Sequence, residues 1–170
     1  MLRVFFPDRD ADSTYEIDFA ALYDKGYRGI IFDIDNTLVP HGEPADERAL
    51  GFFKELKSIG YQTMLLSNNK EPRVKGFADA VGSDYIFKAN KPSRAGYQKA
   101  MEKMGTTREN TLFVGDQLFT DVWGAKRTGI LSYLVKPIHP KEEIQIVLKR
   151  RLEWIVLYFY RKQKSRGKKA

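Results

Sequence analysis

Short apolar runs that alternate with helix-like segments are the feature of this sequence that most restricts its fold. Five such runs are predicted strands, over residues 28–32, 61–67, 84–89, 110–116 and 131–135. Apolar residues at helical spacing predict helices between them, over residues 46–59, 71–82, 93–105 and 121–129. Because the strands are apolar throughout rather than at every second residue, both faces of the sheet should be covered. The sequence therefore predicts an α/β fold, doubly wound around a mostly parallel sheet.

Polar residues follow four of these predicted strands, at the carboxyl end of each. In doubly wound sheets the carboxyl ends of the strands border the crevice in which ligands bind. The residues therefore form one candidate site, although they come from distant parts of the chain. In chain order they are Asp33, Asp35, Thr37, Ser67, Asn68, Asn69, Lys91, Asp116 and Asp121.

The two acids after the first strand have the chemistry for phosphate ester hydrolysis. The carboxylate of Asp33 can attack phosphorus and form an aspartyl-phosphate, which replaces one difficult reaction by two easier ones. Two residues later, on the same side, Asp35 can protonate the leaving oxygen and then take a proton from the attacking water. Either acid alone could instead cap a turn at the end of a strand, so the assignment depends on the other residues of the site.

The remaining polar residues fit the binding of a phosphate and a metal ion. Mg²⁺ takes carboxylate oxygens together with a substrate phosphate, so Asp33 and Asp116 are its expected ligands. Lys91 adds a fixed cation, and Ser67 is expected to hold phosphate oxygens. Asp121 is expected behind them, orienting Lys91 or a metal-bound water, although it could simply cap the following helix.

Four motifs in this order resemble those of the haloacid dehalogenase (HAD) superfamily. They are DIDNT (33–37), LLSNN (65–69), NKP (90–92) and GDQLFTD (115–121), and each follows a predicted strand. The resemblance implies a Rossmann-like core and a Mg²⁺-dependent phosphatase, with Asp33 as the nucleophile and Asp35 as the acid/base. It implies metal binding by Asp33, by Asp35 through its backbone oxygen, and by Asp116. The residues then expected on the substrate phosphate are Thr37, Ser67, Asn68 and Lys91.

The spacing of the motifs indicates the branch of the superfamily. Between Asp33 and Ser67 there are 33 residues, enough for a turn and one helix but not for a cap domain. The chain thus resembles the capless subclass III, and its lead-in is similar to the YqeG-type subclass IIIA, whose mitochondrial relatives are phosphatidylglycerophosphate phosphatases. The expected domains are a capless core over residues 1–136 and a C-terminal helix with a basic tail over 137–170.

The basic charge of the chain is concentrated at its C-terminus. From Lys149 onward there are nine Lys or Arg and one acid, Glu153, so this tail carries +8 while the other 148 residues sum to −1. An amphipathic helix is predicted here, but its apolar run over 154–160 is far shorter than the roughly 20 residues that span a bilayer. Such a helix can lie on an anionic membrane, pack on the core, or meet RNA or a ribosome. Its apolar residues at helical spacing are Ile144, Leu148, Leu152, Ile155 and Phe159.

Two classes of function remain open at this point. The first is a phosphomonoesterase that acts on a phosphatidylglycerophosphate-like lipid or on a small soluble phosphate. The second is a binding or assembly protein that keeps the HAD fold and docks through its tail on RNA or a protein partner. The chain has no cysteine, which excludes disulfides, thiolate zinc sites and a cysteine nucleophile. Because it begins unlike a signal peptide, we expect a cytoplasmic protein, peripheral to the inner face of the membrane if the tail binds lipid.

Overall fold

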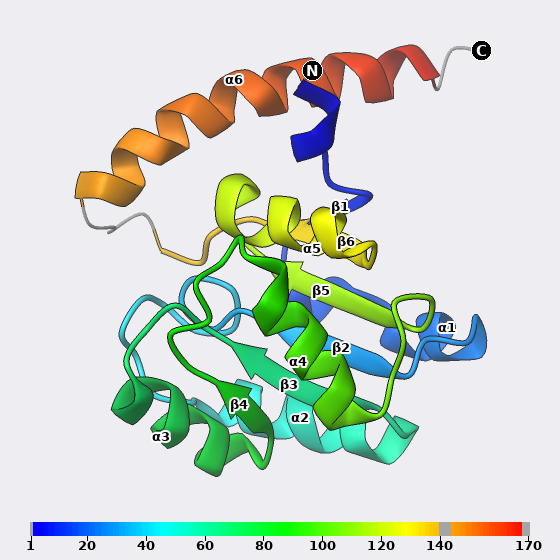
Figure 1. Cartoon of the computed structure of the whole chain (residues 1–170), viewed down its shortest axis with the longest axis vertical. Coiled ribbons are helices and arrows are strands. Elements are labelled where there is room, and N and C mark those ends of the chain that lie inside the picture. The colour runs from blue at the N-terminus through cyan, green and yellow to red at the C-terminus, as the bar shows by residue number, and fades with distance from the viewer. Residues whose placement is uncertain (1, 140–143, 168–170) are drawn as a thin grey trace.

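Six parallel strands form one sheet in the computed structural model, which describes residues 2–139 and 144–167 (Figure 1). From edge to edge the strands are β1 (Arg9–Ala11), β6 (Leu131–Val135), β5 (Thr111–Gly115), β2 (Gly29–Phe32), β3 (Gln62–Leu66) and β4 (Asp84–Ile86). Every strand pairing is parallel. The order of the strands reverses direction between β2 and β5, so the prediction of a doubly wound sheet is confirmed.

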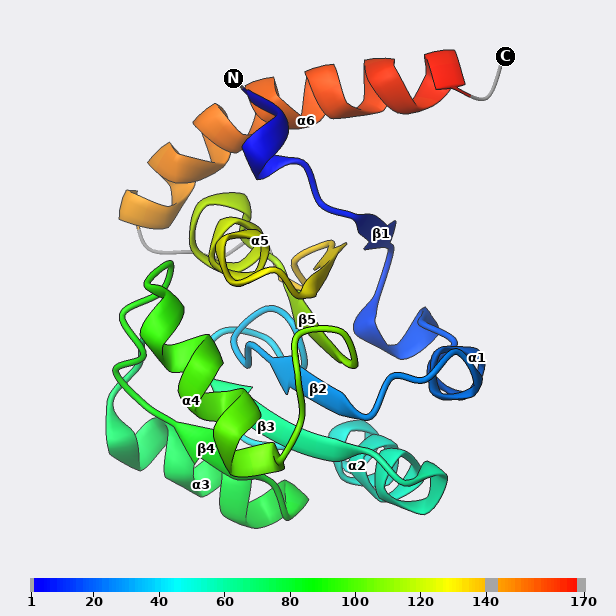
Figure 2. The same cartoon turned by 45° about the vertical axis from the view of Figure 1, so that its right-hand side comes forward.

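Helices cover both faces of this sheet (Figure 2). On one face lie α1 (Phe19–Asp24), α2 (Glu47–Ile59) and α3 (Glu71–Val81). On the other face lie α4 (Arg94–Met104) and α5 (Trp123–Thr128). Three shorter helical turns complete the body: η1 (Leu2–Phe5), η2 (Thr14–Glu16) and the π-helical η3 (Leu118–Val122).

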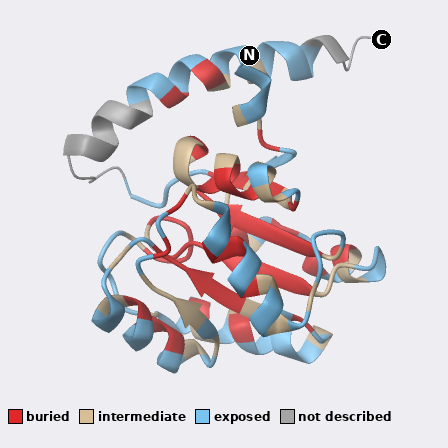
Figure 3. Ribbon diagram, in the orientation of Figure 1, coloured by how far each residue is buried: buried red, intermediate tan, exposed pale blue. Residues whose placement is uncertain are grey.

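Alternate residues of the central strands supply the two halves of the core. On β2, Ile30 and Phe32 pack with α1, α2 and α3, whereas Ile31 belongs to the cluster beneath α4 and α5. All three side chains are fully buried, and Figure 3 shows the same for most of the central sheet. This two-sided burial is the reason that these strands are apolar at every position.

The predicted helix ends are set by local capping. The side chain of Asp46 accepts a hydrogen bond from the backbone N–H of Ala49 at the start of α2, and Ser93 caps α4 in the same way through Ala95. Gly105 ends α4 with φ of +66°, a left-handed conformation that glycine adopts without steric cost.

The N-terminal part of the sheet was not predicted from the sequence. Strand β1 has three residues, Arg-Asp-Ala, and so carries no apolar run. Its position depends instead on Asp8, whose carboxylate accepts hydrogen bonds from the backbone N–H (2.9 Å) and hydroxyl (2.7 Å) of Ser132 and from Lys126 Nζ (2.7 Å). The edge strand is therefore fixed by polar contacts between residues that are far apart in the sequence.

Helix α6 (Ile144–Gly167) crosses the molecule at the edge formed by β1, beside η1 (Figure 1). Among residues 151–165, whose side chains are described, Glu153 and Val156 are buried against the body. Three members of the predicted apolar stripe instead face solvent, with Leu152, Ile155 and Phe159 exposed by 56%, 47% and 45%. The side chains of other predicted residues of this tail lie outside the described part: Ile144, Leu148, Lys149, Arg150, Arg166, Lys168 and Lys169.

The apolar stretch of α6 is short, as the sequence predicted. In the described part of the chain, no helix combines the length and the hydropathy that crossing a bilayer requires.

Candidate active site

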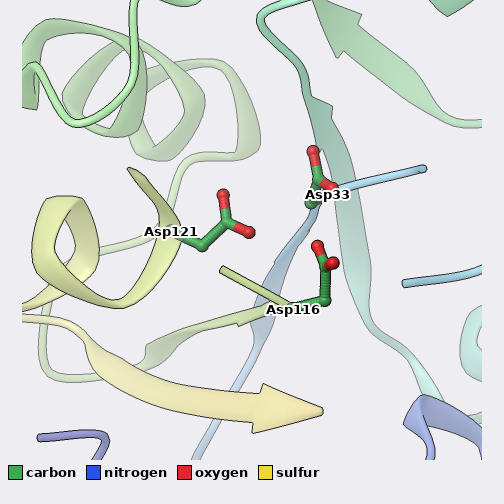
Figure 4. A group of neighbouring side chains, drawn as sticks. All are labelled: Asp33, Asp116 and Asp121. Carbon is green, nitrogen blue, oxygen red and sulfur yellow. The ribbon is translucent and has the colours of Figure 1, made fainter. Parts of the chain in front are cut away.

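Three buried carboxylates gather where the strand order reverses. Asp33 follows β2 and Asp116 follows β5, its neighbour in the sheet, while Asp121 lies in η3 (Figure 4). One carboxylate oxygen from each lies within 4.8 Å of the others. Asp33 is also fixed through its backbone, because its N–H donates to the Val114 carbonyl at 3.0 Å. The site thus occupies the crevice at which α/β sheets bind ligands.

Lys91 reaches this cluster from the loop after β4. Its Nζ atom lies 2.7 Å from Oδ1 of Asp33 and 2.7 Å from Oδ1 of Asp121, and its side chain is 3% exposed. Burial alone would lower the pKa of Lys91, but the adjacent carboxylates of Asp121 and Asp33 outweigh that effect and raise it. The ammonium group is therefore a permanent positive charge between two acids.

For the carboxyl group of Asp33, in contrast, the effect of burial on the pKa is larger than that of the neighbouring lysine. Its burial raises the pKa to about 7, although Lys91 acts to lower it and Asp121 adds to the increase. In the absence of a bound cation, Asp33 thus holds its negative charge weakly. Additional positive charge at the site would favour the carboxylate form that a nucleophile needs.

Asp121 is held by contacts to both oxygens of its carboxylate and to its backbone carbonyl. Oδ1 accepts from Lys91, and Oδ2 accepts from the backbone N–H of Gln117 at 3.1 Å. The hydroxyl of Tyr97 donates to the Asp121 carbonyl, also at 3.1 Å. Gly115 makes room for this arrangement, since a Cβ atom there would lie 2.5 Å from Oδ2 of Asp121.

The predicted phosphate-binding residues line the same edge, with different partners. Thr37 is buried, and its hydroxyl donates to Oδ1 of Asp116 at 3.3 Å. Asn68 holds the backbone of Lys91, accepting from its N–H at 2.7 Å and donating to its carbonyl at 3.2 Å. The buried Ser67 hydroxyl accepts from the N–H of Asn69 at 3.1 Å.

Asp35 lies apart from the three-carboxylate cluster. Its side chain accepts hydrogen bonds from the Gly42 N–H (2.8 Å), Arg73 (2.9 Å) and the Asn69 amide (3.3 Å). Burial alone would raise the pKa of Asp35, but these donors together hold it below the ordinary value. His41 is a further neighbour, with Nδ1 4.0 Å from Oδ1 of Asp35. Sequence reasoning did not identify Arg73 or His41, because an arginine within a helix and a histidine in a loop carry no motif of their own.

The donor set suits a hard divalent cation. Buried carboxylate oxygens from Asp33 and Asp116 are the ligands that Mg²⁺ prefers, and backbone oxygens at the end of β2 are close in sequence. Asp121 fits this role less well, because Lys91 and Gln117 already donate to its two oxygens. Asp33 and Asp116 are therefore the better candidates for metal ligands, while Asp121 contacts Lys91.

Comparison with known proteins gives the class of this site. A family model for haloacid dehalogenase-like hydrolases matches residues 44–129, and the chain belongs to that family. It is 36% identical over 159 residues to the Bacillus subtilis protein named "Probable phosphatase YqeG", with 92% of each chain covered. These findings confirm the predicted family and the prediction of an enzyme of the HAD phosphatase type.

More distant relatives extend the comparison. The chain is 31% identical over 160 residues to phosphatidylglycerophosphate phosphatase 1, chloroplastic/mitochondrial, of Arabidopsis thaliana. The match covers 83% of this chain but only 44% of that protein. A crystal structure of a hypothetical protein from Xanthomonas campestris aligns with a TM-score of 0.55 over 75% of this chain and 74% of that one. At 14% identity, that alignment shows the fold alone.

Proposed function

We propose that this chain is a Mg²⁺-dependent phosphomonoesterase that works through an aspartyl-phosphate on Asp33. The observation that carries the proposal is the buried contact of Lys91 with both Asp33 and Asp121, beside Asp116. A nucleophilic carboxylate, a fixed cation and a second metal-binding acid are the groups that phosphoryl transfer requires. Membership of the HAD-like hydrolases supports the same chemistry.

Each residue has a distinct part in this reaction. Asp33 attacks phosphorus, and Lys91 neutralises charge on the phosphate oxygens while Asp121 keeps its ammonium group in place. Mg²⁺, held by Asp33, Asp116 and the backbone oxygen of Asp35, would supply further positive charge for the phosphate. The hydroxyls of Thr37 and Ser67, which lie at the same edge, are the groups proposed to orient the remaining oxygens.

Asp35 is the proposed acid and base, and the structure defines what this role requires. Arg73 and Asn69 engage its carboxylate and favour the ionised form. To protonate a leaving oxygen, Asp35 must exchange these partners for the substrate, which would raise its pKa. We therefore expect that the side chain of Asp35 turns away from Arg73 when the phosphate ester binds.

We further propose a phosphatidylglycerophosphate-like lipid as the substrate. Two curated relatives, from Arabidopsis thaliana and Chlamydomonas reinhardtii, are named phosphatidylglycerophosphate phosphatases. The outer face of α6, defined here as Leu152, Ile155, Tyr158 and Phe159, is exposed and lies among the basic residues Arg151, Arg161 and Lys162. Apolar and aromatic side chains beside Lys and Arg are typical of a helix that lies at an anionic membrane surface.

The test compares lipid and soluble substrates. Phosphate release would be measured from phosphatidylglycerophosphate in anionic vesicles and from p-nitrophenyl phosphate, each with Mg²⁺ and with EDTA. We expect Asp33→Asn to abolish both reactions. The outer-face variant Ile155→Ser/Tyr158→Ser/Phe159→Ser should lose turnover on vesicles and keep turnover on the soluble ester, because these side chains are exposed.

Three results would each contradict one part of the proposal. Full activity in EDTA would exclude the metal, and equal activity of the outer-face variant on vesicles would exclude membrane docking by α6. Turnover of the soluble ester with none on lipid would keep the mechanism and reject the lipid substrate.

A further inference from the structure

Glu153 is the one acid in the basic segment from Lys149 to the C-terminus, and it is buried. The residue is 3% exposed, whereas its neighbours Leu152 and Trp154 on α6 are 56% and 66% exposed. A buried carboxylate is costly unless it has hydrogen-bond or charged partners. Its position therefore points to a specific contact rather than to general packing.

Two backbone groups that donate to Glu153 lie in the active-site loop after β5. Oε1 accepts from the backbone N–H of Leu118 at 2.8 Å and from that of Phe119 at 3.4 Å. These are the first two N–H groups of η3, where a helical turn has no internal acceptors. Gln117, the residue before this turn, makes no side-chain capping bond, so Glu153 supplies the cap from a distant part of the chain.

The turn that Glu153 caps connects two acids of the site. Asp116 precedes it, and Asp121 lies within it and holds Lys91. Val156 packs with Leu118 in the same small hydrophobic cluster. A cavity of about 210 Å³ separates α6 from the sheet edge, and its lining includes Asp116, Leu118 and Glu153. Helix α6 thus forms the wall next to the catalytic edge.

We propose that Glu153 is a positioning residue for the reaction: by fixing the start of η3, it sets the positions of Asp116 and Asp121. Helix α6 is then part of the catalytic scaffold as well as a docking surface. The functional part of this inference rests on the proposed roles of Asp116 and Asp121. It also means that deleting α6 would disturb the site itself, and so could not isolate membrane binding.

The inference can be tested without measuring turnover. In metal-free, isotope-labelled protein, Glu153→Ala should speed hydrogen exchange of the Leu118 and Phe119 amides by about tenfold or more, because both lose a charged acceptor. Exchange of the Val114 amide in β5 should not change. Glu153→Gln keeps an acceptor oxygen and should restore most of the protection, and Glu55→Ala, which removes an exposed carboxylate from α2, is the matched control.

Mg²⁺ affinity gives the second readout. Following the Gly115 amide resonance during a Mg²⁺ titration, we expect the dissociation constant to rise about tenfold in Glu153→Ala and much less in Glu153→Gln. Unchanged exchange and unchanged Mg²⁺ affinity in Glu153→Ala would overturn the inference. Faster exchange throughout the sheet, Val114 included, would also overturn it, because Glu153 would then act on global stability alone. If the wild-type chain binds no Mg²⁺, the proposed function fails, while the exchange result still decides whether Glu153 fixes the turn.

Discussion

Replacing Lys91 by methionine should destabilise the protein far more than replacing Asp33, the proposed nucleophile, by asparagine. Methionine keeps most of the side-chain volume but leaves Asp121, whose side chain is 1% exposed, without its cation. Breaking a buried ion pair on one side costs about 3–5 kcal/mol. Asp33 limits the cost, since burial already raises its pKa to about 7 and it can accept a proton once the lysine is gone.

Asp33→Asn should have a contrasting effect on stability. The substitution removes one of the mutually repelling carboxylates of the site, while the ion pair between Lys91 and Asp121, at 2.7 Å, is kept. We expect the free energy of unfolding of Asp33→Asn to stay within about 1 kcal/mol of the wild type, because the buried Lys91–Asp121 ion pair is preserved. Both variants should be inactive, so stability separates the two roles.

Thermal unfolding by circular dichroism, in EDTA at pH 8, is the assay for this contrast. A loss of 3–5 kcal/mol corresponds to a fall in Tm of roughly 6–20 °C for a chain of this size. The control is Lys99→Met, an exposed lysine on α4, which should change stability by less than about 0.5 kcal/mol. A Tm for Lys91→Met within 3 °C or so of the wild type would refute the reasoning, since water would then replace the ammonium at little cost.

Three further predictions concern other parts of the chain. Gly115→Ala should lower kcat at least about tenfold, because its Cβ would displace the Asp121 carboxylate. The control is Gly51→Ala on α2, where the added Cβ meets no neighbouring atom, and this variant should be active and no less stable than the wild type. Asp8→Asn should cost about 1–2 kcal/mol in chemical denaturation at pH 7. Burial acts to raise the pKa of Asp8, but hydrogen bonds from Lys126 and Ser132 outweigh it and lower the pKa below the ordinary 3.8. The ionised Asp8 therefore stabilises the fold above about pH 3.8, and this stabilisation should be lost as the pH falls through the folded-state pKa. In vesicle co-sedimentation, Arg151→Ala and Lys162→Ala should each weaken binding about fivefold at low salt, and the difference should shrink in high salt; no effect at low salt would argue against an anionic membrane.

The sequence predicted the elements whose determinants are local. Helix α4 begins after Ser93 and ends before Gly105, as expected, because a capping hydroxyl and a left-handed glycine act within one turn. The central strands were predicted because burial on both faces makes them apolar throughout. Strand β1 could not be predicted in this way, since its pairing depends on Asp8 meeting Ser132, 124 residues later.

The candidate site likewise has features that the sequence predicted and features that it did not. Motif spacing brought Asp33, Lys91 and Asp116 to one edge, because parallel strands end on the same side of a sheet. It did not predict the partners that hold the Asp35 side chain, which are Gly42, Asn69 and Arg73. These contacts join the loop after β2 to the loop after β3 and to α3, and no motif in the sequence marks them.

The charge of the site gives a reason, independent of family membership, to expect a bound cation. Asp33, Asp116 and Asp121 are buried together, and among the described residues Lys91 is the one cation that forms an ion pair with Asp33 and Asp121. With all three acids ionised, the group carries two negative charges in excess. A phosphate monoester would bring up to two more, and unlike Asp121 the proposed nucleophile Asp33 would have to approach it closely. Burial makes each of these charges costly, so binding of substrate should be coupled to uptake of a divalent cation, with protonation of Asp33 as the unproductive alternative.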